Sequence, residues 1–187
     1  MGETLRRDPL PSTPVDDAAL VAEARTGSER AFTALYRRHA RYVAGVVYRL
    51  MGSDGELDDI VQEAFVDALH GLDGLTEPEK FRPWLVTIAV RRVHRRLESR
   101  HRLRTLKSAV GHVMPRHSDP NDRQRVDALY AALDRISAKV RIPWVLHVIE
   151  GESLPEVARC CGVSLATVKR QIAEAGEKIE RRLHEER

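Results

Sequence analysis

Cysteine and aromatic residues are scarce in this 187-residue chain. Its two cysteines are neighbours, Cys160 and Cys161. Adjacent cysteines rarely bridge each other, which excludes a disulfide framework. Both thiols are expected to act as small buried apolar side chains rather than as metal ligands. Aromatic residues make up 5% of the chain, a content that suits small helical bundles better than β-sandwiches.

Membrane-spanning and catalytic signals are also missing. No apolar run approaches the roughly 20 residues that a membrane helix needs, and the first 14 residues contain no signal-peptide core. A soluble, cytoplasmic protein without membrane insertion is expected. The eight histidines are scattered, without a paired metal-binding spacing, and no glycine-rich phosphate loop or catalytic dyad occurs. The sequence therefore predicts no enzyme, no cofactor and no bound metal.

Charge is plentiful and nearly balanced, at 32% charged residues and a net charge of +3, but it is unevenly distributed. Acidic residues gather between Glu56 and Asp67, in a segment that by itself is typical of an ordinary amphipathic surface helix. Seven arginines follow between Arg91 and Arg104, with Glu98 as the one acid among them. Capping a helix end needs fewer cations, so a polyanionic partner is the simpler explanation. The segment predicts a dipolar module that docks a basic protein surface and tracks a phosphate backbone.

The spacing of apolar residues predicts an all-α fold of two small helical domains joined by a flexible linker. The first domain is expected over residues 16–102, after a disordered tail at residues 1–15. Its third helix is expected to direct Leu69 into the core. The linker is expected over residues 103–122 and the second domain over residues 123–187.

The most informative stretch is 154–174, which predicts a helix-turn-helix. A short helix ends at Gly162, which supplies the sharp turn, and Ser164 caps a second helix that directs Val168 and Ile172 inward. The other face of this second helix offers polar donors for phosphates and base edges, as in helices that lie in a DNA major groove. These donors are Thr167, Lys169, Arg170 and Gln171.

The order of acidic helix, basic helix, linker and helix-turn-helix resembles a bacterial RNA polymerase sigma factor of the small extracytoplasmic-function (ECF) type. The resemblance covers the chain from Ala31 to Leu183. Residues 57–65 are similar to the family's polymerase-binding segment, and residues 81–89 to its promoter-melting segment. Residues 150–153 match the family's entry to its C-terminal domain, and residues 167–169 match the start of its recognition helix.

The resemblance implies a protein that binds core RNA polymerase and directs promoter recognition, DNA melting and transcription initiation at a specialised regulon. It implies polymerase-binding roles for Asp58, Asp59, Ile60, Gln62, Glu63 and Phe65. The implied contacts with minus-ten DNA are Arg82, Trp84, Arg91, Arg92, Arg95 and Arg96. Those with minus-thirty-five DNA are Ser164, Thr167, Lys169, Arg170, Gln171 and Glu174. The implied partners are core RNA polymerase, promoter DNA and an anti-sigma factor.

Some positions depart from the family pattern. Arg91 and Arg95 replace an Asn and an Asp, which favours backbone contacts over base contacts in the basic helix. Pro143 is expected to kink its helix. The recognition helix of the family usually continues with arginines, whereas Gln171, Glu174 and Gly176 occur here, which predicts a weaker or differently specified upstream element.

Two alternatives stay open. The first is a stand-alone helix-turn-helix transcriptional regulator, whose N-terminal module senses a ligand or dimerises. The second is a sigma-like interaction module that no longer binds DNA. Dependence of promoter opening on core polymerase distinguishes the sigma factor from both.

Overall fold

The computed structural model describes residues 16–108 and 122–185, in which every regular element is helical. The all-α prediction is confirmed. The N-terminal module contains α1 (Asp17–Arg25), α2 (Glu29–Met51), α3 (Leu57–Gly71), the short turns η1 (Leu72–Gly74) and η2 (Pro78–Lys80), and α4 (Phe81–Ser108). The C-terminal module contains α5 (Asp122–Leu133), α6 (Ala138–Trp144), η3 (Val145–Ile149), α7 (Leu154–Cys161) and α8 (Leu165–Glu185).

The predicted helix ends follow from local chemistry. The Ser28 hydroxyl accepts a hydrogen bond from the Ala31 amide at 3.3 Å and caps α2, which ends at Gly52 with a φ of 68°, a conformation that favours glycine. The expected tail lies outside the described residues, as does most of the expected linker. However, α4 continues to Ser108, because its sequence after Pro83 is rich in arginine and leucine, which favour helix, and contains no further proline and no glycine.

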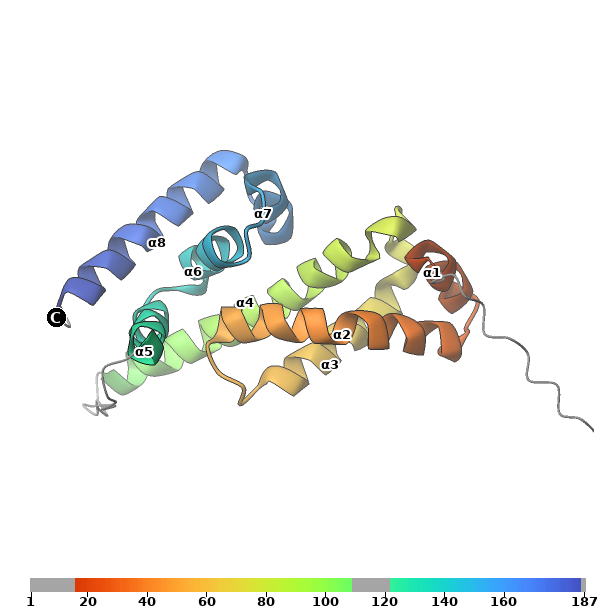
Figure 1. The fold of residues 1–187 in the computed structure, drawn as a ribbon, viewed down its shortest axis with the longest axis horizontal. Coiled ribbons are helices and arrows are strands. Elements are labelled where there is room, and N and C mark those ends of the chain that lie inside the picture. Colours follow the sequence, from red (N-terminus) through yellow and green to blue (C-terminus); the bar gives the residue numbers. More distant parts are fainter. Residues whose placement is uncertain (1–15, 109–121, 186–187) are drawn as a thin grey trace, which may run out of the picture.

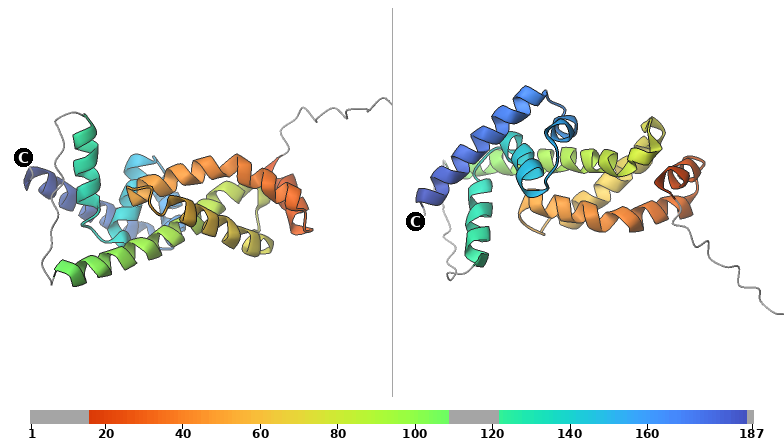
Figure 2. Two further views of the ribbon diagram at one scale, coloured as in Figure 1. Left: turned by 90° about the horizontal axis from the view of Figure 1, so that it is seen from below. Right: turned by 45° about the horizontal axis from the view of Figure 1, so that its top comes forward.

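The N-terminal module packs α2, α3 and α4 alongside one another, with α1 across one end (Figure 1, Figure 2). Leu35, Ile60 and Phe81 are fully buried where these helices meet. The prediction that Leu69 faces the core is wrong, since 46% of this residue is exposed. The core-facing positions of α3 are Ile60, Val61, Ala64, Phe65 and Ala68, and Leu69 lies beyond the edge of the arc that they cover.

The C-terminal module is a helix-turn-helix supported by α5 and α6. Gly162 lies between α7 and α8 with a φ of 66°, as the turn prediction requires. Val157, Val168 and Ile179 are buried in this module. Pro143 lies inside α6, and the hydrogen-bond pattern changes to a π-helix two residues later, at Val145. The kink expected at Pro143 stays a prediction, and the structure shows a change of helix type after the proline.

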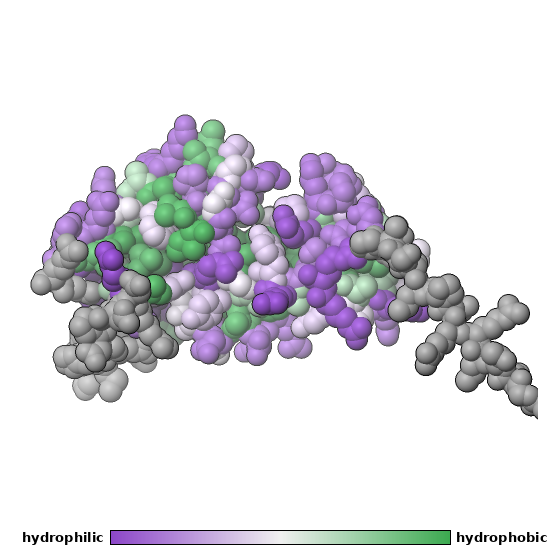
Figure 3. Space-filling model, in the orientation of Figure 1, coloured by the Kyte–Doolittle hydropathy of each residue, from purple (hydrophilic) through white to green (hydrophobic). Residues whose placement is uncertain are grey.

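The two modules also contact each other. Helix α4 packs against α6 and α7, and α2 packs against η3, so the buried residues of both modules form one continuous apolar core. In the view of Figure 3, hydrophobic atoms gather mainly over the C-terminal module, while the surface over α1 and α2 is mostly hydrophilic. None of the helices in the described ranges is long and apolar enough to cross a membrane.

Candidate protein and nucleic-acid interfaces

Helix α3 has one face in the core and one in solvent, and the two faces divide the predicted polymerase-binding residues. Asp58, Asp59 and Gln62 are exposed. By contrast, Ile60 is 0% exposed and Phe65 is 3% exposed. The Phe65 ring packs at 4.6 Å from the ring of Tyr36, between centroids. Ile60 and Phe65 therefore support α3 from beneath and are not available for direct contact with a partner.

Sequence reasoning missed two apolar members of the exposed face. Val66 and Leu69 are 45% and 46% exposed. Together with Asp59 and Gln62 they form a continuous line, because each residue follows the previous one by three or four positions. This line, Asp59, Gln62, Val66 and Leu69, is named the α3 stripe. Counting steps of three and four residues from Asp59, instead of from the core residues, predicts the α3 stripe from the sequence.

The remaining acids of this region pair with arginines of α4. Arg92 donates to Glu63 at 3.0 Å and to Asp67 at 2.6 Å, and Arg96 donates to Glu63 at 2.8 Å. Arg96 and Arg100 also reach Glu56. The hydrogen bond from Arg92 lowers the pKa of the Asp67 carboxyl. Six side chains thus form the α3–α4 ion-pair network, namely Glu56, Glu63, Asp67, Arg92, Arg96 and Arg100.

This network engages two of the arginines that the resemblance assigns to DNA. Arg92 and Arg96 were predicted to hold DNA, but they join two helices of the same module. Arg91 and Arg95 are exposed on another side of α4, and among the described residues neither forms an ion pair. The sequence could not separate the two pairs, because it shows seven similar arginines and not which of them face α3.

The start of α4 carries the other predicted minus-ten residues. The exposed Arg82 guanidinium lies 5.0 Å from the centre of the Tyr42 ring, close enough for a cation–π interaction. Trp84 is half-buried, 6.0 Å from the Phe81 ring and against Gly71 at the end of α3. Trp84, Arg91 and Arg95 lie on one side of α4 at spacings of seven and four residues and are named the α4 face. Arg82, two residues before Trp84, lies on another side of the helix, towards α2.

Helix α8 presents a polar outer surface, as predicted, except that Gln171 does not belong to it. Ser164 caps the helix by accepting from the Thr167 amide at 3.2 Å, and Lys169, Arg170 and Glu174 are exposed. Gln171 is only 3% exposed, and its Oε1 has no hydrogen-bond partner in the described part of the chain. It lies three residues after the buried Val168, on the inward side of α8, so it cannot contact DNA in this arrangement.

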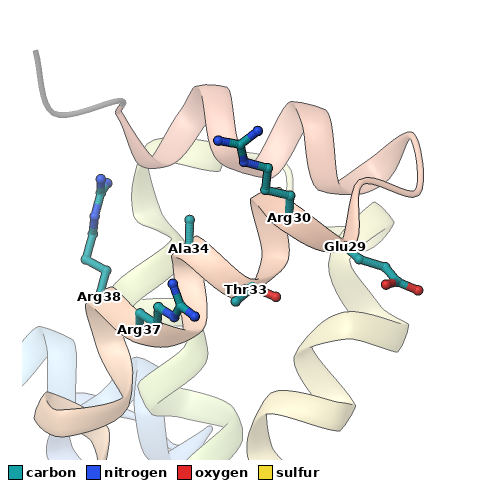
Figure 4. Close-up of a pocket in the computed structure, with 6 residues that line it drawn as sticks. All are labelled: Glu29, Arg30, Thr33, Ala34, Arg37 and Arg38. Carbon is teal, nitrogen blue, oxygen red and sulfur yellow. The ribbon is translucent and has the colours of Figure 1, made fainter. Parts of the chain in front are cut away.

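Figure 4 shows a hollow in the surface over the first half of α2. It is lined by three arginines with Glu29, Thr33 and Ala34. The arginines are Arg30, Arg37 and Arg38, and Arg38 pairs with Asp17 at 2.6 Å. The hollow is open to solvent and offers no catalytic arrangement.

The two cysteines are free and half-buried. Burial raises the pKa of both thiols, that of Cys161 to about 12. Protonated thiols are poor nucleophiles and poor metal ligands. Among the described residues, no group of three or more histidine, cysteine or acidic side chains could hold a metal ion.

An exposed acidic and apolar stripe, an arginine-bearing face and a helix-turn-helix on one all-helical chain define a DNA-binding factor with a further protein-docking surface. Comparison with known proteins gives the family. Residues 35–103 match sigma-70 region 2, and residues 127–179 match sigma-70 region 4. The chain is 30% identical over 174 residues to the RNA polymerase sigma factor NccH of Alcaligenes xylosoxydans xylosoxydans, which covers 89% of this chain and 94% of NccH.

Two further relatives agree. CnrH of Cupriavidus metallidurans is 31% identical over 87% of this chain and 92% of its own, and the ECF sigma-E factor of Escherichia coli is 27% identical over 92% of this chain and 96% of its own. The chain belongs to the sigma-70 family and is an ECF-type sigma factor. It is a non-enzymatic initiation factor, and the stand-alone regulator is not favoured.

Solved structures show the same architecture. CnrH in complex with the cytosolic domain of CnrY superimposes with a TM-score of 0.62 at 28% identity, over 91% of this chain and 99% of that one. The sigma factor RpoE of Bartonella quintana, in complex with the anti-sigma factor NepR, has the same fold, with a TM-score of 0.59 at 21% identity, over 83% of this chain and 98% of that one.

Proposed function

We propose that this sigma factor uses three exposed surfaces in initiation: the α3 stripe with Asp58 for core RNA polymerase, the α4 face for the opened minus-ten strand, and the outer side of α8 for the minus-thirty-five element. One observation carries the assignment. The three surfaces belong to different helices and their charged side chains are exposed, whereas Ile60, Phe65 and Gln171 are buried and Arg92 and Arg96 are paired within the module. Buried or already paired groups add little to a new contact.

The α4 face suits separated DNA strands. A base leaves the stack at a cost of a few kcal/mol, and an aromatic side chain such as Trp84 offers it a surface on which to stack. Arg91 and Arg95 are placed to hold the backbone beside it, and their charges compensate that cost. Residues 72–80 join α3 to α4 and lead directly into this helix.

The outer side of α8 suits duplex DNA. Lys169 and Arg170 lie one turn after the capped N-terminus, where side chains of a recognition helix reach base edges and phosphates. Two modest DNA contacts on one chain, held together by polymerase, strengthen each other through effective concentration.

An anti-sigma factor is the second proposed protein partner. The relatives CnrH and RpoE were solved with CnrY and with the anti-sigma factor NepR respectively. A regulator that covers the α3 stripe would compete directly with polymerase. The place of action proposed for this chain is the cytoplasm, where core polymerase and promoters occur.

Transcription in vitro tests the proposed function. The templates are the promoters of those genes whose transcripts rise when the protein is overproduced. Core polymerase with this chain is expected to open these promoters and to yield transcripts, whereas neither component does so alone. The stand-alone regulator would instead bind duplex DNA without polymerase. Lack of any polymerase-dependent opening would contradict the proposed function.

Replacing Glu174 with arginine is expected to tighten binding to the upstream element. Glu174 is exposed on the outer side of α8 and pairs with Lys178 at 2.6 Å, so the substitution removes a negative charge facing phosphate and frees a lysine. About a tenfold gain is expected at low salt, decreasing as salt rises. Gel shifts with upstream duplex measure this effect, with the distant Glu23→Arg as the matched control. Unchanged affinity would contradict the placement of α8 in the groove.

A further inference from the structure

Helix α1 lies across the end of the N-terminal module, against the short turns that join α3 to α4 (Figure 1). It precedes residues 35–103, the part of the chain that matches sigma-70 region 2, and it contributes to none of the three proposed surfaces. Two of its charged side chains, Asp17 and Arg25, form hydrogen bonds to other elements of the module. Both sets of contacts continue to Trp84 of the α4 face.

The first set begins at Arg25 and holds the turn after α3. The Arg25 Nε and Nη2 atoms donate to the Leu72 carbonyl oxygen at 3.2 and 3.0 Å, and Nη2 also donates to the Leu75 carbonyl oxygen. A guanidinium is a planar, rigid fork, so it fixes these two carbonyls relative to each other. Leu72 directly follows Gly71, and a Cβ added to Gly71 would lie 3.5 Å from Cζ2 of Trp84. Arg25 thus fixes the backbone against which one side of the indole rests.

The second set begins at Asp17 and passes through two buried rings. The Asp17 Oδ2 atom lies 2.9 Å from Nε2 of His39, whose side chain is 6% exposed. The His39 ring centre lies 5.4 Å from that of Phe81. Phe81, the first residue of α4, is fully buried and lies 6.0 Å from the Trp84 ring, between centroids. Helix α1 therefore reaches Trp84 by a second, independent route.

These contacts restrict the indole while leaving part of it open. Trp84 is half-buried, with Gly71 and the Phe81 ring beside it. Stacking of an unpaired base requires an aromatic ring with an accessible face. A ring that is already fixed when the strand arrives avoids the entropy cost of being ordered during binding. The orientation of Trp84 before binding therefore contributes to the affinity for an opened strand.

We infer that α1 positions Trp84 for the opened minus-ten strand, and that Arg25 and the Asp17–His39 pair are positioning residues and not DNA contacts. This inference rests on the proposed function of the α4 face. Without the bonds from α1, the Trp84 ring loses its fixed orientation, while Arg91 and Arg95 keep their charges. Binding of the strand then weakens through the aromatic contact and not through the phosphate contacts.

Tryptophan fluorescence and strand binding together test the inference. Trp144→Phe leaves Trp84 as the one tryptophan of the chain. In this background Arg25→Ala is expected to shift the emission of the free chain to longer wavelength and to increase its quenching by acrylamide, because a loosened ring meets more water. Holoenzyme formed with the variant is expected to bind single-stranded minus-ten DNA about three- to tenfold more weakly. The slope of log affinity against log salt is expected to stay unchanged, since no phosphate contact is lost.

Three variants serve as controls. Arg37→Ala removes another exposed arginine, on α2, and is expected to change neither the fluorescence nor the affinity. Arg25→Lys keeps the positive charge but lacks the fork, so it is expected to behave like Arg25→Ala. Asp17→Ala interrupts the second route and is expected to change the fluorescence in the same direction. Thermal unfolding of every variant is recorded, so that all measurements are made on folded chains.

Each outcome has one meaning. Unchanged Trp84 fluorescence in both Arg25→Ala and Asp17→Ala would refute positioning by α1. A lower salt slope in Arg25→Ala, or full strand binding by Arg25→Lys, would make Arg25 a phosphate contact and would also overturn the inference. Trp84→Ala tests the proposed function separately: if it bound the strand like wild type, the stacking role would be wrong, whatever the fluorescence of the α1 variants.

Discussion

Reversing the charges of Asp58 and Asp59 to arginine is expected to abolish initiation by removing the chain from polymerase. Both side chains are exposed, and neither takes part in an ion pair among the described residues. Like charges juxtaposed in an interface cost several kcal/mol, and about 1.4 kcal/mol corresponds to a factor of ten in affinity. Binding of core polymerase is therefore expected to weaken by roughly 100-fold or more.

The measurement is a titration of labelled chain with core polymerase, followed by transcription at saturating chain. Glu23→Arg on α1 is the matched control, because Glu23 is also exposed and lies on a different helix. Asp58 and Asp59 lie in the first turn of α3, where acids are favoured by a few tenths of a kcal/mol each, so thermal unfolding of both variants is recorded as well. If the charge-reversed variant bound core polymerase with wild-type affinity, the proposed contact between α3 and polymerase would be contradicted.

The second prediction with a large effect compares two pairs of arginines on α4. Arg91 and Arg95 form one pair, and their sequence neighbours Arg92 and Arg96 form the other. Arg91→Ala with Arg95→Ala is expected to weaken binding of the opened strand by about 10–100-fold and to lower the slope of log affinity against log salt by about 0.7 for each lost phosphate contact. The melting temperature is expected to stay nearly unchanged, since both side chains are exposed and outside the α3–α4 ion-pair network.

Arg92→Ala with Arg96→Ala is expected to give the opposite pattern. These substitutions leave Glu63 and Asp67, one turn apart on α3, without their cations, while Glu56 keeps its contact with Arg100. The pairs are partly exposed, so solvent screening limits the expected loss to about 1–2 kcal/mol of unfolding free energy, or roughly 2–8 °C in melting temperature. The two double variants are each other's controls in strand binding and in calorimetry. If both double variants lowered the salt slope equally, the prediction that Arg91 and Arg95 contact DNA while Arg92 and Arg96 only pair with α3 would be wrong.

Much of the local structure could be predicted because it depends on near neighbours in sequence. Ser28, Gly52, Gly162 and Ser164 mark helix ends through their own backbone and side-chain chemistry. The errors lie at the edges of helix faces. Leu69 and Gln171 were assigned to the wrong side, since the apolar pattern gives the centre of a buried arc and not its width.

The sequence by itself determined the helices, the helix-turn-helix and the two oppositely charged segments, because apolar period, capping residues and charge are properties of short stretches. Only the tertiary structure decided which arginines pair with α3, which α3 residues reach solvent, and that Arg49 meets Glu150. These outcomes depend on the rotation of each helix about its axis and on the packing of residues up to 101 positions apart. Packing between residues far apart in the sequence decides which of several chemically equivalent arginines meets a given carboxylate, and no local sequence pattern encodes that pairing.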